Sequence, residues 1–466
     1  MALECGLYAG SGHSAETLAR TIFRRGTVHF RATRCFWLAT ILLLIMTGLW
    51  AGANQSTLFS TSLWPYRALT QLMALWSAVL AILALLSIVR SSALEFFFGG
   101  LDEAVRLHRK LGLAAVLLQG GHVLFLVVQL SLHEAPLALV LLAEPSNPRA
   151  IDILAAYGLL VLGVLAYTNW LPHEWWVRLH RLIGLLFLVG IVSAATFSGV
   201  THAYEPLRIF IVILFLLGSF SWVYQVLLFR AYGPRFRYQL TKVRLRNSDV
   251  MDLHLRPTDK RMMYLPGSFV FISLPSFKGR ESELHPFSIS SCPTDRDLRL
   301  SCRRVGDFTT ELSKLALMPP EDTRETFIYG PFGAFTPHRF APYRRMIWIG
   351  AGIGITPFLS MVAFERSNQD FRRVWLYYAV RSPEDAVYDQ ELKDNIQHAD
   401  SLIDYTLWVS GTQGRLTAAR ILADIELDDY AVLLCGSKTF VAEMSAAFLA
   451  AGVAAERVIT EELQFR

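Results

Sequence analysis

The chain has 466 residues, of which 53% are hydrophobic and only 18% are charged. That balance is too apolar for a soluble protein of this length, and the apolar excess lies almost entirely before residue 230. The net charge of +5 is small and no basic face with interleaved aromatic residues is present, which argues against a nucleic-acid partner. We therefore expect a half embedded in the lipid bilayer, followed by a soluble half.

Six segments are long and apolar enough to cross a bilayer, since a helix needs about 20 apolar residues to span the hydrocarbon core. None of them contains Asp, Glu, Lys or Arg. They are Phe36–Ala53, Ala68–Val89, Leu111–Leu132, Ile153–Leu171, Leu182–Val200 and Ile209–Phe229. Six such runs in succession predict a six-helix transmembrane bundle over residues 36–230, preceded by a cytosolic segment, residues 1–35.

Basic residues are distributed unequally between the two sides of the predicted bundle. One side carries Arg20, Arg24, Arg25, Arg31, Arg34, Arg90, Arg106, Arg109, Lys110, Arg178 and Arg181, and the other carries Arg67, Arg149 and Arg208. Cytoplasmic loops are enriched in Lys and Arg. The N-terminus and the soluble half are therefore expected on the cytoplasmic face of the cell membrane (inner or plasma membrane).

Two histidines occupy the same place in a repeated phrase. Val105-Arg-Leu-His-Arg-Lys-Leu-Gly112 leads into the third span, and Val177-Arg-Leu-His-Arg-Leu-Ile-Gly184 leads into the fifth. His108 and His180 should therefore lie at the same depth, near the cytosolic entrance. Two facing imidazoles can hold a haem iron through its axial positions, and the following glycines would leave room for the porphyrin. The alternative is that both histidines are interfacial residues near lipid headgroups.

A third histidine lies deeper in the predicted bundle. His122 follows His108 by 14 residues, about 21 Å along a helix, where an outer haem would sit. Its partner on the fifth span would be residue 193 or 194, but Ser193 and Ala194 stand there. His202 is roughly 12 Å further along the axis. The inner haem site is thus expected to be complete, whereas the outer site lacks one ligand.

The soluble half divides into two patterns. Residues 235–335 read as short strands with turns between them, which predicts a small antiparallel β-barrel. Residues 340–466 alternate strands and helices, which predicts a doubly wound α/β domain. In the latter, Gly350-Ala-Gly-Ile-Gly-Ile-Thr-Pro357 is a glycine-rich turn between a buried strand and a helix. Backbone N–H groups and the helix dipole of such a turn can meet a pyrophosphate.

Further motifs complete a resemblance to a known family. His285-Pro-Phe-Ser288, Gly306-Asp-Phe-Thr-Thr310, Cys435-Gly436 and the ending Glu461-Glu-Leu-Gln-Phe-Arg466 accompany the glycine-rich turn. Over residues 36–466 the chain resembles the ferric reductases and NADPH oxidases. Its membrane half is similar to a ferric reductase transmembrane domain, and its soluble half to the ferredoxin–NADP reductase fold. Members with two haems have two histidines on each of spans three and five, whereas this chain keeps three of the four.

The resemblance implies roles for individual residues. Flavin would be contacted by His285, Pro286, Phe287 and Ser288, and the FAD pyrophosphate by Gly306, Thr309 and Thr310. NAD(P)H would be contacted by Gly350, Gly352, Gly354, Thr356, Pro357 and Gly436, with Cys435 near the nicotinamide. Phe465 would stack on the flavin and leave before hydride transfer. Alternatively, His285 is a turn residue, Thr356 and Pro357 mark only a helix start, and Phe465 belongs to a core.

The implied activity is electron transfer across the membrane. Electrons would pass from NAD(P)H to FAD, then to haem b between His108 and His180, and outward past His122. Arg381 and Arg415 offer charge for a 2′-phosphate, which favours NADPH over NADH, although Arg381 could equally be a solvated surface residue. The expected acceptor at the outer face is ferric iron or a ferric chelate. The alternatives are a superoxide-generating oxidase, and a reductase that passes electrons to a quinone or a partner protein.

Overall fold

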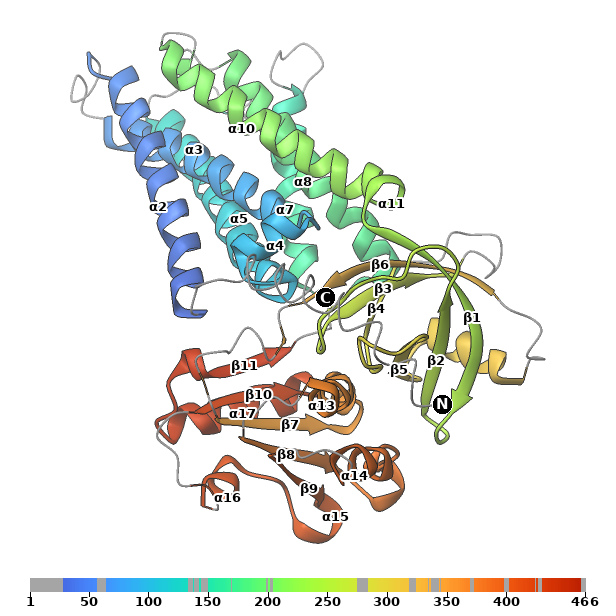
Figure 1. The fold of residues 1–466 in the computed structure, drawn as a ribbon. Coiled ribbons are helices and arrows are strands. Elements are labelled where there is room, and N and C mark those ends of the chain that lie inside the picture. Colours follow the sequence, from blue (N-terminus) through green and yellow to red (C-terminus); the bar gives the residue numbers. More distant parts are fainter. Residues whose placement is uncertain are drawn as a thin grey trace. The chain divides into compact units, whose positions relative to one another are not determined.

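The computed structural model describes two separate units (Figure 1). One spans Ala32–Gly233 and the other contains Pro234–Arg466. The residues described are 28–56, 64–132, 137, 142–143, 150–168, 170–197, 200–201, 204–274, 284–317, 324–333, 335–336, 343, 345–368, 373–397, 402–423, 425 and 430–461.

The first unit is a bundle of apolar helices (Figure 1). Its long helices are α2 (Val28–Ala53), α3 (Trp64–Ser87), α5 (Leu101–Leu132), α7 (Ala150–Tyr167), α8 (His173–Phe197) and α10 (Glu205–Val223). The short α4 (Ser92–Phe98) precedes α5, and a π-helical turn (Tyr224–Leu228) joins α10 to α11 (Phe229–Tyr232). Six helices in the described part of the chain are long and apolar enough to cross a membrane. The prediction of six spans is confirmed.

The helices that carry the repeated phrase begin well before their apolar segments. α5 starts at Leu101 and α8 at His173, because the charged and polar residues that lead into each span are themselves good helix formers. His108 and His180 each lie seven residues after the first residue of their helix, about two turns inside it. Backbone hydrogen bonds on both sides therefore hold the two imidazoles on rigid helix, rather than at a frayed end.

The second unit opens with an antiparallel six-stranded sheet in the order β4-β3-β6-β1-β2-β5. The strands are β1 (Arg235–Leu245), β2 (Val250–Pro257), β3 (Phe269–Ser273), β4 (His285–Ser288), β5 (Leu298–Arg303) and β6 (Arg324–Phe332). A bridge between Ile289 and Leu300 brings the two edges together, so the sheet is a nearly closed barrel, as expected. Pro286 is tolerated because β4 is an edge strand.

A parallel five-stranded sheet follows in the order β11-β10-β7-β8-β9. Its strands are β7 (Arg345–Ala351), β8 (Arg373–Val380), β9 (Ile403–Val409), β10 (Tyr430–Cys435) and β11 (Val458–Glu461). The helices are α13 (Thr356–Asn368), α14 (Asp389–Gln397), α15 (Ser410–Gln413), α16 (Ala418–Ala423) and α17 (Lys438–Ala450). Strands that alternate with helices form the doubly wound domain that the sequence predicts.

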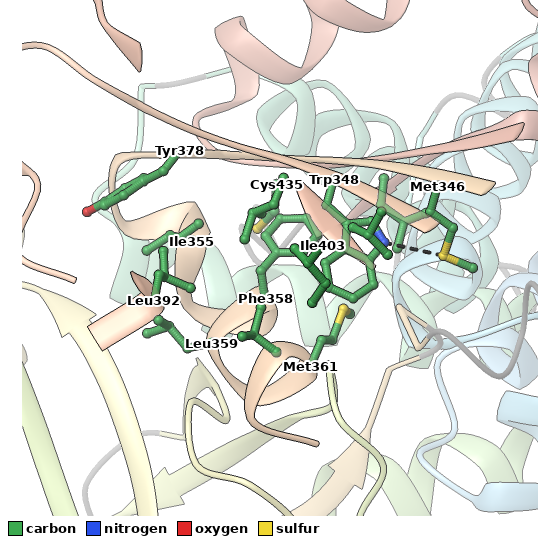
Figure 2. Close-up of a cluster of buried hydrophobic side chains, with 14 of the residues drawn as sticks. Met346, Trp348, Ile355, Phe358, Leu359, Met361, Tyr378, Leu392, Ile403 and Cys435 are labelled. Atoms are coloured by element: carbon green, nitrogen blue, oxygen red, sulfur yellow. Dashed lines mark hydrogen bonds between the residues drawn. The ribbon is translucent and has the colours of Figure 1, made fainter. Parts of the chain in front are cut away.

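The core of this α/β domain reaches the carboxyl end of its parallel strands. Figure 2 shows Trp348 of β7, Phe358 of α13 and Cys435 of β10 in one buried cluster. The indole N–H of Trp348 donates to Met346 Sδ at 3.3 Å within it. Cys435 is therefore a core residue as well as the last residue of its strand, and the packing of β7 and α13 fixes its position.

A buried ionic cluster joins the barrel to the α/β domain. Asp252 of β2 is fully buried. Its carboxylate accepts hydrogen bonds from Ser301 Oγ and Tyr388 OH, each at 2.7 Å, and pairs with Arg246 Nε at 2.5 Å. Glu391 of α14 lies 3.1 Å from Arg246 Nη2 and so extends the cluster. These contacts hold the edge of the barrel against α14.

Candidate functional site

Two histidines face each other between α5 and α8. His108 Nε2 lies 3.4 Å from His180 Nε2, and the two rings are inclined at 73°. His108 Nδ1 donates to the carbonyl oxygen of Ala84 on α3 at 2.9 Å. The ring of His180 stacks on Trp176, with centroids 4.7 Å apart. The carbonyl and the indole thus orient the two imidazoles toward a common point.

This pair suits the axial ligands of a haem iron. Because Nδ1 of His108 carries the proton that it donates to the carbonyl oxygen of Ala84, Nε2 is unprotonated. Nε2 therefore has the lone pair that a metal ion requires. Metal–imidazole bonds are about 2 Å long, so an ion between two Nε2 atoms would separate them by about 4 Å, close to the observed spacing. Nδ1 of His180 is buried with no hydrogen-bond partner among the described residues. The residues present therefore fit a bis-histidine haem.

The two glycines of the repeated phrase differ in their surroundings. A Cβ at Gly112 would meet nothing within 4 Å. A Cβ at Gly184 would lie 2.8 Å from Trp222 Cδ1 and 3.2 Å from Leu85 Cδ2. Gly184 thus lets the Trp222 indole of α10 pack against α8, whereas the space beside Gly112 is open. The sequence repeat did not reveal this because Trp222 lies on another helix.

The other end of the bundle contains a cavity of about 680 Å³. His122 lines it, and its Nδ1 donates to the carbonyl oxygen of Thr70 at 2.8 Å. Among the α8 residues that line the cavity are Gly190 and Ser193. No second histidine lines it among the residues that the structure describes, and His202 lies outside them.

Ser288, Cys435 and Glu461 meet in the second unit. Ser288 ends β4, Cys435 ends β10 and Glu461 ends β11, and all three are buried. Glu461 Oε2 lies 3.5 Å from Ser288 Oγ and 3.6 Å from Cys435 Sγ. Burial, together with the negative charge of Glu461, raises the pKa of the Cys435 thiol well above its usual value. Cys435 is therefore a neutral thiol at physiological pH rather than a nucleophilic thiolate.

The role of Glu461 was not identified from the sequence. The sequence contains part of the signal, because Val458-Ile-Thr-Glu461 is a short β-branched run that ends in an acidic residue. The structure shows that this strand pairs in parallel with β10. In an α/β sheet, residues at the carboxyl ends of neighbouring strands gather at one edge. What the sequence does not contain is the approach of Ser288, which lies 173 residues earlier.

The backbone of the glycine-rich turn, Gly350–Pro357, lies against the end of β10 at Cys435. Gly352 has a φ of +55°, which favours glycine. A Cβ at Gly354 would lie 2.4 Å from the carbonyl oxygen of Cys435, so only glycine allows this approach. Thr356 starts α13 and its hydroxyl donates to Ile353 O at 3.0 Å, with Pro357 in the first turn, where no backbone donor is needed. Gly350 ends the buried part of β7, and Gly436 follows Cys435.

The predicted flavin residues lie on β4 and α12 (Asp307–Lys314). His285 stacks on Phe308, with centroids 3.8 Å apart, and Phe287 is buried with its ring 6.3 Å from Phe308. Thr309 Oγ1 accepts from the backbone N–H of Gly306 at 3.1 Å and caps the helix. Thr310 N–H donates to Gly306 O at 2.9 Å. His285 therefore has an aromatic partner within the protein itself.

Arg381 and Arg415 are exposed residues that follow neighbouring parallel strands. Arg381 comes directly after β8, and Arg415 follows β9 and α15. Arg415 Nη2 lies 2.5 Å from Glu443 Oε2. Exposed ion pairs contribute little to stability, so this one leaves the guanidinium available to a competing anion. Phe465 lies outside the described residues.

Three protein-family models match successive parts of the chain. A ferric reductase like transmembrane component matches residues 73–191, an FAD-binding domain matches 235–336, and an oxidoreductase NAD-binding domain matches 348–446. The histidine pair falls within the first match, the Ser288 motif within the second, and the glycine-rich turn and Cys435 within the third.

Curated relatives match parts of the chain. It is 26% identical over 247 residues to a superoxide-generating NADPH oxidase heavy chain of Dictyostelium discoideum, covering 47% of this chain and 33% of that protein. It is 28% identical over 154 residues to NADPH oxidase 1 of Mus musculus, covering 32% of this chain and 25% of that protein. The chain thus spans about a third or less of the length of these relatives.

A solved ferredoxin NADP+ reductase from Neisseria gonorrhoeae with bound FAD and NADP matches 49% of this chain and 98% of its own, at 18% identity and a TM-score of 0.42. The transmembrane, FAD-binding and NAD-binding domains follow one another on a single chain, and NADPH oxidases are among its relatives. The protein is thus a multi-pass membrane protein that joins a ferric reductase like transmembrane component to FAD-binding and NAD-binding domains, and it is similar to the ferric reductases and NADPH oxidases.

Proposed function

We propose that this protein transfers electrons from NAD(P)H, through FAD and a haem b held by His108 and His180, to an acceptor at the opposite face of a membrane. The observation that supports this proposal most strongly is the pair of imidazoles within an apolar helix bundle, whose Nε2 atoms lie 3.4 Å apart. FAD-binding and NAD-binding domains on the same chain supply the reductant.

Bound FAD would take hydride from the nicotinamide and pass single electrons to the haem, which accepts one at a time. The residues of this chain prepare the hydride transfer. Glu461 places a buried carboxyl group beside Ser288 and Cys435. Its negative charge would stabilise the positive charge that the nicotinamide ring gains when hydride leaves. The neutral thiol of Cys435 donates to the same carboxyl oxygen and keeps it oriented.

The nucleotide is proposed to be NADPH rather than NADH. Arg381 and Arg415 both follow strands at the carboxyl edge of the parallel sheet, where nucleotides bind in this class of fold. A guanidinium there can pair with a 2′-phosphate in a bidentate manner. The FAD pyrophosphate is proposed to bind at Gly306, Thr309 and Thr310, at the start of α12. Backbone N–H groups and the helix dipole favour an anion at such a helix N-terminus.

The acceptor is open between ferric iron or a ferric chelate, oxygen, and a quinone or a partner protein. The sequence favours ferric iron or a ferric chelate. The name of the Dictyostelium relative, a superoxide-generating oxidase, favours oxygen. Reduction of a ferric chelate and formation of superoxide, each measured with the purified full-length chain and NADPH, would distinguish them.

His180→Ala tests the haem assignment. The purified wild type should show a low-spin haem spectrum that NADPH reduces without oxygen, whereas the variant should lose that spectrum because one axial ligand is gone. Leu182→Ala is the matched control, since Leu182 lies on the same helix and is 43% exposed. FAD content and NADPH-dependent flavin reduction should be the same in all three proteins, which separates loss of haem from misfolding. A variant that retains the full low-spin spectrum would refute the assignment.

A further inference from the structure

The cavity at the His122 end of the bundle is suited in size to an organic molecule. Its volume of about 680 Å³ lies within the range of roughly 300–1,000 Å³ for small-molecule sites. A water molecule occupies only about 30 Å³, and dioxygen is of comparable size. The lining is largely aliphatic and aromatic, with residues such as Leu126, Leu186, Phe187 and Ile191.

The cavity is also electrically balanced. Among its described lining residues the basic one is Arg67 and the acidic one is Asp152. A highly charged ferric chelate would find no excess of opposite charge there to compensate for leaving water. A neutral molecule meets no such cost.

The lining of the cavity offers both a hydrogen-bond acceptor and a hydrogen-bond donor. His122 donates through Nδ1 to Thr70 O at 2.8 Å, so its Nε2 is left as an acceptor. Gln71 Oε1 accepts from the Trp50 indole at 2.8 Å, so the N–H groups of its amide remain as donors. Both side chains line the cavity, and His122 contacts the backbone of Thr70, the residue before Gln71.

The same residues do not fit a second bis-histidine haem. Such a haem needs an imidazole nitrogen from each of two facing helices, as His108 and His180 provide at the other end. Here the described lining from α8 consists of Leu186, Phe187, Gly190, Ile191 and Ser193, and none of these side chains has a nitrogen ligand. A Cβ at Gly190 would meet nothing within 4 Å, so the α8 side is open space.

We propose that this cavity binds a neutral quinone, with its ring among the apolar side chains and its oxygen atoms at His122 and Gln71. This quinone is the terminal electron acceptor, so the proposal rests on the proposed function and names its substrate class. A quinone carbonyl accepts from the Gln71 amide, and the hydroxyl of the product quinol donates to His122 Nε2. The polar pair thus serves both oxidation states of the ring.

The overall reaction balances as NAD(P)H + H⁺ + quinone → NAD(P)⁺ + quinol. The C–H bond that yields hydride is broken at the nicotinamide, which is oxidised. The quinone is reduced by the two electrons, which reach it one at a time. Two O–H bonds form on it, with both protons taken from water at its own face, while the proton of the hydride is released on the nucleotide side.

The test uses full-length protein in lipid nanodiscs, with decylubiquinone as the probe. Quinone-dependent NADPH oxidation should fall about tenfold in His122→Leu and in Gln71→Leu, because each loses one hydrogen bond to the ring. The control is Ser131→Ala, which changes an exposed hydroxyl on α5 that bonds only within its own helix turn and does not line the cavity. NADPH reduction of the His108/His180 haem without oxygen should be unchanged in all of these proteins.

Ser193→His provides the opposite change. It restores an imidazole on α8 at the cavity, so the variant should gain a second low-spin haem per chain and lose quinone reduction. The pyridine haemochrome and the FAD content give the stoichiometry without reference to activity.

Three results would overturn the proposal: two haems per wild-type chain, quinone reduction of undiminished rate in both His122→Leu and Gln71→Leu, or undiminished quinone reduction in Ser193→His. The failure of the proposed function looks different. In that case NADPH would not reduce the His108/His180 haem of the wild type, whatever the quinone does.

Discussion

At the scale of single residues, the proposed hydride transfer depends on three side chains that meet at the ends of strands β4, β10 and β11. Glu461 contacts Ser288 from the barrel and Cys435 from the α/β domain, and both contacts end on the same carboxyl oxygen. A buried carboxyl group in such a position acts on charge far more strongly than it would in water. Its proposed task is to favour the cationic product of hydride transfer.

Glu461→Gln should therefore slow flavin reduction by NADPH at least tenfold, since the amide keeps the shape but removes the charge. Stopped-flow measurement of flavin absorbance under saturating NADPH gives the rate. Glu325→Gln, which alters an exposed carboxylate on β6, should leave the rate unchanged. An unaltered rate in Glu461→Gln would mean that this residue has a packing role only.

At the scale of elements, the Asp252 cluster fixes the barrel against α14. Burial by itself would raise the pKa of Asp252, but hydrogen bonds from Ser301 and Tyr388, and the charges of Arg299 and Arg246, outweigh it and hold the pKa below its ordinary value. A carboxyl group with a depressed pKa in the folded protein stabilises the fold above the pKa of the unfolded chain. That contribution is lost as the pH falls through the depressed value.

Asp252→Asn should lower the free energy of unfolding by about 3–5 kcal/mol at pH 7, because Arg246 then loses its buried partner. Thermal unfolding followed by flavin release is a suitable measurement. The difference between variant and wild type should shrink as the pH falls from about 4, the ordinary pKa of an aspartate, through the lower pKa that Asp252 has in the folded protein. A pH-independent difference would contradict the assigned ion pair. Asp259→Asn, at an exposed site 60% accessible to solvent, is the control.

At the scale of the whole molecule, the proposed function requires the reductase unit to oxidise NAD(P)H at one face of the membrane. The helical bundle must then deliver the electrons to an acceptor at the other face. The basic residues that flank the spans predict that the reductase unit lies on the cytoplasmic side. The His108/His180 pair is on the α5 and α8 segments nearest that side in the proposed topology, and the His122 cavity is nearer the other. Electrons would thus enter at one face and leave toward the other.

Sealed vesicles test this orientation. Inverted vesicles of the cell membrane should oxidise added NADPH with FAD and haem reduction, whereas right-side-out vesicles should do so only after detergent opens them. The nucleotide does not cross the bilayer, so the rate in inverted vesicles should be much the higher of the two. Equal rates in both preparations would mean that the reductase unit is on the other side in part of the molecules, against the proposed topology.

Features that depend on local patterns could be predicted from the amino-acid sequence. Six apolar runs are enough to predict six spans, because the bilayer sets the length of a spanning helix. Strand and helix periodicity predicted the barrel and the doubly wound domain, both confirmed. The repeated phrase placed His108 and His180 at the same position in two helices, since helical periodicity is also local. Their role as haem ligands stays a prediction.

The tertiary structure alone decided what depends on segments far apart in the chain. It placed Glu461 beside Ser288, which is 173 residues away in the chain. It also packed the Trp222 indole against Gly184. In addition, it left a cavity that both His122 and Gln71 line. A glycine or a carboxyl group in a sequence does not reveal its neighbours, because these are set by how helices and strands pack rather than by the local pattern.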